Sequence, residues 1–436
     1  MEDKSSARAS GPASSWKSTL VVSAVNILAS GRNALFYFRM KILWQLRPAF
    51  ACALGLSLGC VSQQRGASAE SSRNSKEFLV YVGTYTGPKS KGIYVSRFAS
   101  ASGKLDAPEL AAETISPSFL ALHPNRRFLY AANEIGDFGG KKSGAVSAFV
   151  IDSRTGKLVP LNQQPSGGDG PCHLFVDRTG KTVLVANYGG GSVEALPIKP
   201  DGSLDSPAIF IQHHGTSADP QRQEGPHAHF IATDAANRFA LACDLGLDKV
   251  LVYKFDPANG SLVANDPASA SVAPGSGPRH LAFHPRGRYA YVINEMKCTM
   301  TTFSYEPERG EMKLLQTLST LPDGETAKPN YSTAEVEAHP NGRFLYGSNR
   351  GHNSIVVFAI DENTGKLARV ENVSTQGKTP RSFGIDPTGN YLLAANQDSD
   401  NVVVLRIDQK TGRLTATGTS VEVGAPVCVK FVPVVN

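Results

Sequence analysis

The sequence predicts an all-β protein, a seven-bladed β-propeller closed by its C-terminal strand. Two independent repeats support this prediction. The first consists of an apolar strand, a His/Asp-Pro-x-Gly type of turn, an aromatic-rich strand and a closing Asn, as in LALHPNRRFLYAANE, LFVDRTGKTVLVANY and LAFHPRGRYAYVINE. Its intact and degraded copies end near Thr84, Glu134, Tyr188, Asp244, Glu295, Asn349 and Asn396.

The second repeat is a glycine-centred turn followed by an apolar residue, as in SGKL, DGSL and TGRL. Its glycines are Gly103, Gly156, Gly202, Gly260, Gly310, Gly365 and Gly412, so the two repeats give the same count. Each unit spans roughly 50 residues with about four short strands and cannot bury its apolar faces alone, which is typical of a propeller blade. Glycine supplies turn dihedrals that other residues avoid.

The ends of the repeat predict how the ring closes. The first unit begins directly at its second strand, FLVYVGTY (78–85), while the chain ends in an unmatched strand, GAPVCVKFVP (424–433). We expect this C-terminal strand to become the innermost strand of the first blade. Such closure removes exposed sheet edges, which are sites of aggregation.

The N-terminal residues have the features of a targeting segment. Residues 40–69 combine a basic start, an apolar run from Ala49 to Val61 and the small-x-small sequence Ala67-Ser68-Ala69, which fits an export signal. We therefore expect a leader at 40–69, a linker at 70–77 and the propeller at 78–436. Because a signal sequence normally opens its chain, residues 1–39 are expected to be a non-native extension. The expected location is periplasmic, or membrane-bound through a lipid on Cys60, and cytoplasmic if the leader does not function.

Charge and cysteine usage exclude several functions. The first 69 residues hold 8 Lys/Arg and 2 Asp/Glu, which leaves 36 residues of each sign in the rest of the chain, so no nucleic-acid partner is expected. The cysteines beyond residue 69 have neither paired nor zinc-like spacing, so we expect buried thiols and no metal or other cofactor. They are Cys172, Cys243, Cys298 and Cys428. The sequence does not indicate an oligomeric state.

The chemically unusual residues are predicted to lie on one face of the ring. If the strands of a blade are named A to D from the axis outward, the D–A and B–C loops share one face, which we call the mouth face. The HPxGR and TGKL turns lie on the opposite, far face. The D–A loops and strand A starts contribute GPCH, QHHGTSADPQRQEGPHAH, GPRH, STAEVE and TPRS, and the strand B ends add Asn133-Glu134, Asn187-Tyr188, Asn294-Glu295 and Asn349-Arg350.

These motifs resemble the seven-bladed propeller lactonases, which include bacterial 6-phosphogluconolactonase and, more distantly, the fungal carboxymuconate cyclase. The resemblance covers residues 76–433 and is carried by GSGPRHLAFHPRGRYAYVINE, GPCHLFVDRTGK and RQEGPHAH. It implies a small sugar lactone as the partner, namely 6-phospho-D-glucono-1,5-lactone in the pentose phosphate pathway, and hydrolysis without an obligatory metal. The family's mouth residues correspond to His173, His227, Arg279, His280, Glu295, Glu335 and Arg381, with Arg222 matching members that have longer loops.

The chemistry of lactone opening suits these residue types. Histidine can transfer protons near neutral pH, and arginine can bind both an oxyanion and a phosphate. We expect His173 to be the base, with His227 as the alternative, Arg279 and Arg381 to clamp anions, and Glu295 or Glu335 to orient a histidine. The further substrate-binding candidates are Arg222, Asn187, Tyr188 and His229.

Several residues also have a structural interpretation. The histidines of the HP turns, His123, His284 and His339, are expected to be structural, and His213 and His214 to be solvated in a loop. His227 and His229 flank one residue and could share a metal, but no carboxylate stands at a convincing ligand spacing. The glycines at 189–191 fit a tight B–C turn better than a phosphate-binding loop.

Three classes of function remain open from sequence alone: a sugar-lactone hydrolase, a cycloisomerase that forms a lactone, and a non-catalytic binding propeller. The joint presence of His173, Arg279 and Glu295 argues against the last. A phosphorylated sugar lactone is a cytosolic metabolite, so the expected leader favours an unphosphorylated or different lactone.

Overall fold

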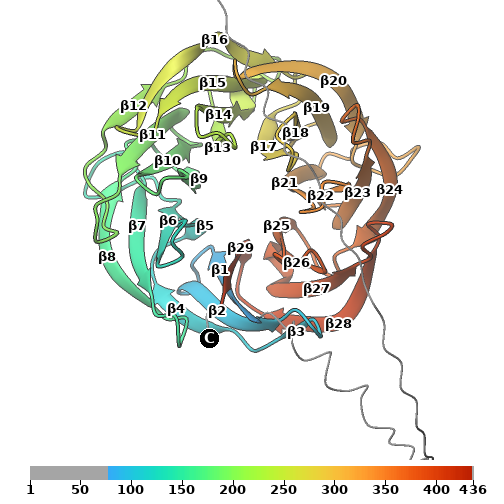
Figure 1. The fold of residues 1–436 in the computed structure, drawn as a ribbon, viewed down its shortest axis with the longest axis horizontal. Helices are drawn as coiled ribbons and strands as arrows, with labels where there is room; N and C mark the ends of the chain where they lie inside the picture. The colour runs from blue at the N-terminus through green and yellow to red at the C-terminus, as the bar shows by residue number, and fades with distance from the viewer. Residues whose placement is uncertain (1–76, 435–436) are drawn as a thin grey trace, which may run out of the picture. The chain divides into compact units, whose positions relative to one another are not determined.

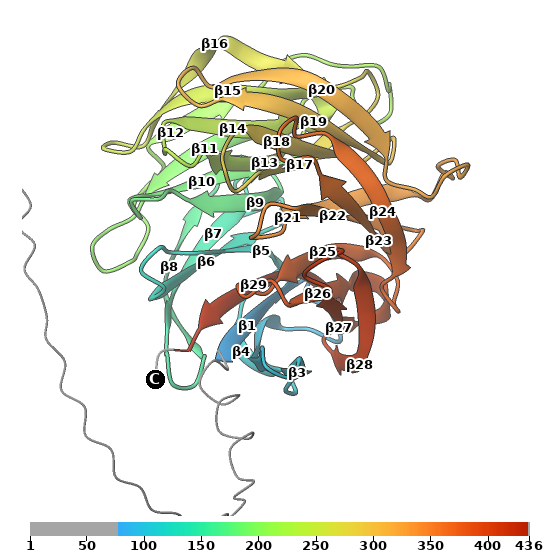
Figure 2. The same cartoon turned by 45° about the vertical axis from the view of Figure 1, so that its right-hand side comes forward.

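The repeated strands form seven antiparallel sheets that radiate from a common axis, as the computed structural model shows for residues 77–434 (Figure 1). Each sheet is one blade of a propeller, and successive blades follow one another around the ring. Seen obliquely, the outer strands of the blades wrap around the inner ones (Figure 2). The predicted seven-bladed propeller is therefore confirmed.

The strands have the following bounds. Blade 1 contains β1 (Glu77–Thr84), β2 (Gly92–Ala99), β3 (Lys104–Leu105), β4 (Glu109–Glu113) and β29 (Pro426–Pro433). Blade 2 contains β5 (Pro117–Leu122), β6 (Phe128–Asn133), β7 (Ala145–Ile151) and β8 (Leu158–Pro165), and blade 3 contains β9 (Pro171–Val176), β10 (Thr182–Asn187), β11 (Ser192–Pro197) and β12 (Ile209–Gln212). Blade 4 contains β13 (Ala228–Thr233), β14 (Phe239–Asp244), β15 (Lys249–Asp256) and β16 (Ser261–Ser271), and blade 5 contains β17 (Pro278–Phe283), β18 (Tyr289–Asn294), β19 (Thr299–Glu306) and β20 (Glu311–Ser319). Blade 6 contains β21 (Ser332–Ala338), β22 (Phe344–Arg350), β23 (Ser354–Ile360) and β24 (Leu367–Ser374), and blade 7 contains β25 (Pro380–Ile385), β26 (Tyr391–Asn396), β27 (Asn401–Ile407) and β28 (Leu414–Glu422). Two short 3-10 helices, η2 (Leu245–Leu247) and η3 (Gln397–Ser399), form B–C loops.

Closure of the ring follows the prediction from the unmatched terminal strand. β29 lies innermost in blade 1 and pairs antiparallel with β1, in a register that joins Phe78 to Pro433 and Val82 to Val429. The last strand of the chain thereby completes the sheet that the first strand begins.

The two sequence repeats meet at the boundaries between blades. A strand B tyrosine donates a hydrogen bond to the carbonyl of the C–D turn glycine in the next blade, as Tyr81 does to Gly156 at 2.8 Å and Tyr346 to Gly412 at 2.8 Å. A Cβ atom on Gly412, whose φ is +73°, would lie 2.4 Å from the ring of Phe344. Both the dihedral and the packing therefore require glycine.

The histidines of the HP turns join neighbouring blades on the far face. His123, His284 and His339 each place Nε2 within 2.8–2.9 Å of a glycine carbonyl in the next blade. This agrees with the structural role expected for them.

The predicted leader, linker and N-terminal extension lie outside the described residues, apart from Glu77, the last residue of the predicted linker, which begins β1. No helix among residues 77–434 is both long enough and apolar enough to cross a bilayer.

Candidate active site

Every inner strand carries a β-bulge close to its mouth-face end. In each inner strand the pairing register shifts just after the first residues, so that two of its residues face one residue of strand B in the same blade. A bulge bends the strand and redirects a side chain. The bulged positions are Ser118, Cys172, His229, Arg279, Ala334–Glu335, Arg381 and Val427. Most of them line one small cavity at the centre of the mouth face.

Glu295, which follows strand B of blade 5, binds three arginines. Its Oε1 lies 2.8 Å from Nη2 of Arg222, and its Oε2 lies 3.2 Å from Nε of Arg279 and 2.9 Å from Nη2 of Arg350. Burial alone would raise the pKa of Glu295, but Arg350, Arg279 and Arg222 lower it to about 2. Glu295 is therefore a counter-ion that holds arginines in place, and it does not orient a histidine.

Arg222 comes from the long loop between β12 and β13. Asp219 caps a turn by accepting from the backbone N–H groups of Gln221 and Arg222, and Gln223 donates to the carbonyl of Leu245 at 2.8 Å. These bonds direct Arg222 over the mouth, where its Nη2 also donates to the Tyr188 hydroxyl at 3.0 Å.

His227 stacks on the Tyr188 ring, with the ring centroids 4.7 Å apart. Its Nδ1 lies 3.0 Å from the backbone carbonyl of Tyr188, which can only accept, so Nδ1 carries the hydrogen and Nε2 the lone pair. His229, the bulged residue of β13, contacts the same tyrosine edge-on and places its Nδ1 3.5 Å from the Cys172 sulfur.

Arg381 occupies the other side of the mouth. Its guanidinium lies 5.2 Å from the centre of the Tyr85 ring and 3.8 Å from Oε1 of Glu134. The Tyr85 hydroxyl donates to Oε2 of Glu134 at 2.8 Å. Four arginines and three carboxylates thus surround the mouth, which leaves a net positive charge for an anionic ligand; they are Arg222, Arg279, Arg350, Arg381, Glu134, Glu295 and Glu335.

A histidine–carboxylate pair lies below the arginines. Nδ1 of His280 is 2.7 Å from Oε1 of Glu335, and both side chains are buried. Burial lowers the pKa of His280 to about 4, although Glu335 opposes this shift, so the imidazole is neutral at pH 7. Because a carboxylate only accepts, Nδ1 carries the hydrogen and the Nε2 lone pair is left without a hydrogen-bond partner among the described residues.

His173 lies beside this pair in apolar surroundings. Its ring packs between Phe119 and Phe230, with centroid distances of 4.2 and 4.4 Å, and lies 5.2 Å from the His280 ring. Burial, followed by the charges of its neighbours, lowers the pKa of His173 well below its usual value. Among the described residues, no carboxylate forms a hydrogen bond with its ring.

The small cavity at the centre of the mouth is polar. It is lined by His280, Glu335, Arg279, Arg381, Glu134, Cys172 and Ser118, among others. Both Nε2 of His280 and the Ser118 hydroxyl are buried there without a hydrogen-bond partner. A site with unpaired polar atoms and room of about one water is where buried water binds in proteins.

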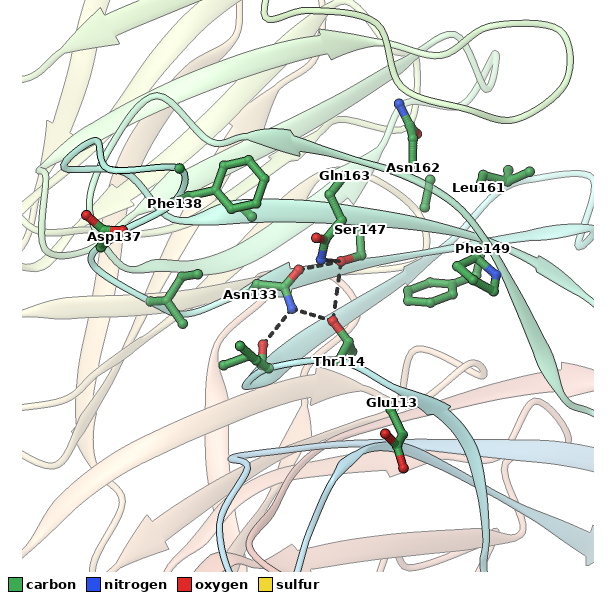
Figure 3. A pocket seen from close by; sticks show the side chains of 16 residues that line it. Glu113, Thr114, Asn133, Asp137, Phe138, Ser147, Phe149, Leu161, Asn162 and Gln163 are labelled. Carbon is green, nitrogen blue, oxygen red and sulfur yellow. Dashed lines mark hydrogen bonds between the residues drawn. The ribbon is translucent and has the colours of Figure 1, made fainter.

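A cavity outside the ring of inner strands lies at the boundary of blades 1 and 2 (Figure 3). Its floor is a chain of hydrogen bonds in which Gln163 donates to Ser147, Ser147 to Asn133, and Asn133 to Thr114. Among the described residues that line it there is no histidine, lysine or arginine, so it offers no cationic clamp for an anion, and its ionisable groups are the carboxylates of Glu113 and Asp137.

The structure brings most of the predicted site residues together around the mouth: His173, His227, His229, Arg222, Arg279, His280, Glu295, Glu335, Arg381 and Tyr188. Asn187 is an exception, since its buried amide donates to the Ser166 carbonyl at 2.9 Å and to Ser192, which holds the B–C turn. The expectation of solvated loop histidines is wrong for His213. It is buried between Asp244, 2.6 Å away, and the Tyr253 hydroxyl, 2.9 Å away.

The residues of the mouth that were not among the predicted site residues include Arg350, Glu134, Tyr85, Cys172 and Ser118. Arg350, Glu134 and Tyr85 occupy the strand B end that Glu295 and Tyr188 occupy in other blades, so position in the repeat was the available signal. Among residues 77–434 no three His, Cys, Asp or Glu side chains converge as a metal site.

Comparison with known proteins bears on this arrangement. The family model "Lactonase, 7-bladed beta-propeller" matches residues 79–431. The chain belongs to the seven-bladed β-propeller lactonase family. A Bacillus subtilis protein named 6-phosphogluconolactonase is 40% identical over 355 residues, which cover 81% of this chain and 98% of that protein. A Formosa agariphila protein of the same name is 34% identical over 311 residues, covering 70% and 86%.

Among solved structures, the periplasmic gluconolactonase of Pseudomonas aeruginosa has a TM-score of 0.77 and 36% identity to this lactonase, covering 82% of this chain and all of that one. Lactonases cleave cyclic esters and are carboxylic-ester hydrolases. Membership of the family therefore places this protein among the enzymes that open lactones.

Proposed function

We propose that this lactonase hydrolyses a sugar lactone at the mouth, with 6-phospho-D-glucono-1,5-lactone as its substrate and 6-phosphogluconate as its product, a step of the pentose phosphate pathway. The observation that supports this most directly is the position of the Arg222, Arg279 and Arg350 guanidiniums around Glu295, above the His280–Glu335 pair. Arginines can bind phosphate and oxyanion, and the pair can activate water.

The neutral His280 is the proposed base. Its Nε2 takes a proton from water as the water oxygen bonds to the lactone carbonyl carbon, and Arg279 or Arg381 stabilises the resulting oxyanion. When the bond from the carbonyl carbon to the ring oxygen breaks, Nε2 returns the proton to that oxygen. Glu335 holds the tautomer and stabilises the imidazolium in between.

This assignment transfers the role of base from His173 to His280. His280 has the orienting carboxylate and an unpaired Nε2 at the mouth cavity, whereas Nδ1 of His173 accepts from the backbone N–H of Ile231 at 3.4 Å. His227 stays the alternative, because its Nε2 carries a lone pair, lies 3.7 Å from Oε1 of Glu224 and is nearer the rim.

The phosphate of the substrate is assigned to the exposed side of the mouth. The Arg222 side chain is 44% exposed there, so it can exchange part of its contact with Glu295 for a phosphate oxygen. The export leader expected at residues 40–69 and the periplasmic gluconolactonase among the structural relatives favour a second candidate, an exported enzyme that opens an unphosphorylated lactone.

The test compares hydrolysis of 6-phosphogluconolactone and gluconolactone by the wild type and by His280→Gln, His227→Gln and His173→Gln. We expect His280→Gln alone to lose about a hundredfold or more in kcat. If only His227→Gln loses kcat, His227 at the rim is the base. Absence of hydrolysis of both lactones by the wild type, together with turnover of a muconate, would replace the proposal by cycloisomerisation.

A further inference from the structure

A second cavity reaches the same histidines from the far face. It has ≈ 1040 Å³ of space free of protein atoms, part of it open to solvent. Its lower wall includes the last residues of four inner strands, which lie next to the far-face turns: Leu122, Val176, Thr233 and Phe283. Its upper wall includes Phe119, His173 and Glu335. We call this space the lower cavity.

Small side chains give the lower cavity its width. Ala121 and Ala232 line the lower cavity and follow Phe119 and Phe230 by two residues. Because side chains alternate along a strand, each alanine lies on the same face of β5 or β13 as its phenylalanine. At this level the inner strands contribute two charged groups, Glu337 from β21 and Lys430 from β29.

Glu337 and Lys430 interact electrostatically with Glu335, the carboxylate of the catalytic pair. Lys430 Nζ lies 4.6 Å from the centre of the Phe119 ring, and the Glu337 carboxylate accepts from the backbone N–H of Ile385 at 2.9 Å. Lys430, Glu335 and Glu337 act on one another electrostatically, since Lys430 lowers the pKa of both carboxyl groups.

Glu335 connects the two cavities. It lines the small cavity at the mouth and also the lower cavity, and its Oε1 contacts Nδ1 of His280. A group with one side to the base and the other to a solvent-filled space can pass a proton between them.

Lactone hydrolysis produces a proton that such a path can carry away. The immediate product is a carboxylic acid, which at neutral pH yields a carboxylate and one proton in each turnover. While the carboxylate is bound between the arginines, product and guanidiniums cover the mouth side of His280. The proton of the product acid can then leave in another direction while the carboxylate is still bound.

We propose that the lower cavity is the proton exit of this lactonase, with Glu335, cavity water and Glu337 as the relay to the far face. The proposal rests on the function proposed above. The product acid transfers its proton to Glu335, which lines the same small cavity, while His280 keeps its hydrogen on Nδ1 and its lone pair on Nε2. Glu335 releases it through cavity water to Glu337, and Glu337 releases it to far-face solvent. Every group returns to its starting state, and no other reactant is required.

The acidity of Glu337 suits this task. Burial raises its pKa to about 7, with Glu335 adding to the shift and Lys430 opposing it. A carboxyl group with a pKa near the working pH can both take and release protons quickly. The other charged or titratable residues that line the lower cavity are His173 on β9 and Arg178 in the following turn.

The experiment is steady-state hydrolysis by Glu337→Gln at pH 7 in a dilute buffer and then in rising concentrations of imidazole. We expect kcat in dilute buffer to fall by about tenfold, KM to stay unchanged, and imidazole to restore kcat, because a small base entering the lower cavity replaces the carboxylate. The wild type should not respond to imidazole. Glu337→Asp should retain most of kcat.

Two further variants complete the test. Glu113→Gln, at the cavity between blades 1 and 2, is the matched control and should behave as the wild type. Ala121→Phe narrows the lower cavity, so its kcat should fall without rescue by imidazole. An active wild type with an unchanged Glu337→Gln variant, or a loss that imidazole does not restore, would overturn the relay and leave the proposed hydrolysis standing. An inactive wild type would instead refute the proposed function.

Discussion

At the scale of single residues, charge balance organises the mouth. Arg279 is almost fully buried, and burial together with Arg350 and Arg381 lowers its pKa to about 10, so it stays charged at pH 7. Glu295 compensates that charge and gathers two further arginines. An anionic substrate therefore meets guanidiniums that are already oriented, which reduces the entropy lost on binding.

Arg350 tests this account, because it reaches Oε2 of Glu295 at 2.9 Å and the Thr333 carbonyl at 2.8 Å. Replacing it by Met removes one cation from the proposed anion site. We expect KM for the phosphorylated lactone to rise by about tenfold or more, with a smaller effect on gluconolactone. Equal effects on both lactones would show that Arg350 does not bind the phosphate.

Glu194 on β11 predicts how stability depends on pH. Burial raises its pKa to about 8, and its Oε2 has no hydrogen-bond partner among the described residues. Between about pH 4.5 and 8 the folded state keeps a proton that the unfolded state releases, so the free energy of unfolding falls as the pH rises. Glu194→Gln removes this loss. In urea unfolding, the substitution should raise the free energy of unfolding more at pH 9 than at pH 5. An equal gain at both pH values would contradict the assignment.

The catalytic pair gives a second pH prediction. With a His280 pKa of about 4, the base is deprotonated at all pH values well above 4, so kcat/KM should hold to about pH 5 and fall below it. Glu335 raises the pKa of His280, so Glu335→Gln should shift the fall of kcat/KM to lower pH and also reduce kcat. A wild-type limb near pH 6 to 7 would indicate a different base.

At the scale of elements, the strands and their order could be predicted from the repeats, but the bulges could not. One extra residue in GPRH or GPCH leaves the alternation of apolar residues almost unchanged, yet it decides whether Arg279 or Cys172 faces the mouth. Partner choice was also hidden, although Glu295 follows a strand B and Glu335 lies near the start of a strand A. Which one meets arginines and which meets His280 depends on neighbouring blades. Asn187 and His213 could not be placed for a related reason, because their partners lie on other segments, Ser166 in the loop after β8, and Asp244 and Tyr253 on β14 and β15.

The β12–β13 loop provides a test at this scale. Gln223 is fully buried and ties the loop to the Leu245 carbonyl. Gln223→Ala should loosen the loop, raise KM through displacement of Arg222, and cost about 1–3 kcal/mol of stability. The KM effects of Gln223→Ala and Arg222→Met should not add in the double variant. Additive effects would mean that Gln223 acts independently of Arg222.

At the scale of the whole molecule, the ring depends on its last strand. Removing residues 426–436 would expose the inner edge of β1 and leave the Phe78–Phe431 contact, with centroids 6.1 Å apart, unmade. We expect this truncation to yield aggregated or unfolded protein by size-exclusion chromatography and melting. Removal of residues 435–436 alone should have no effect. A soluble ring without β29 would contradict the closure argument.

The pairing of β29 with β1 also sets an order of events during biosynthesis. Blade 1 cannot be completed until β29 leaves the ribosome, so β1 lacks its inner partner while the other six blades are synthesised. Lys430 arrives with that same strand. A chain released before β29 is made therefore lacks both the closing strand and the cation that interacts with Glu335 and Glu337 in the lower cavity.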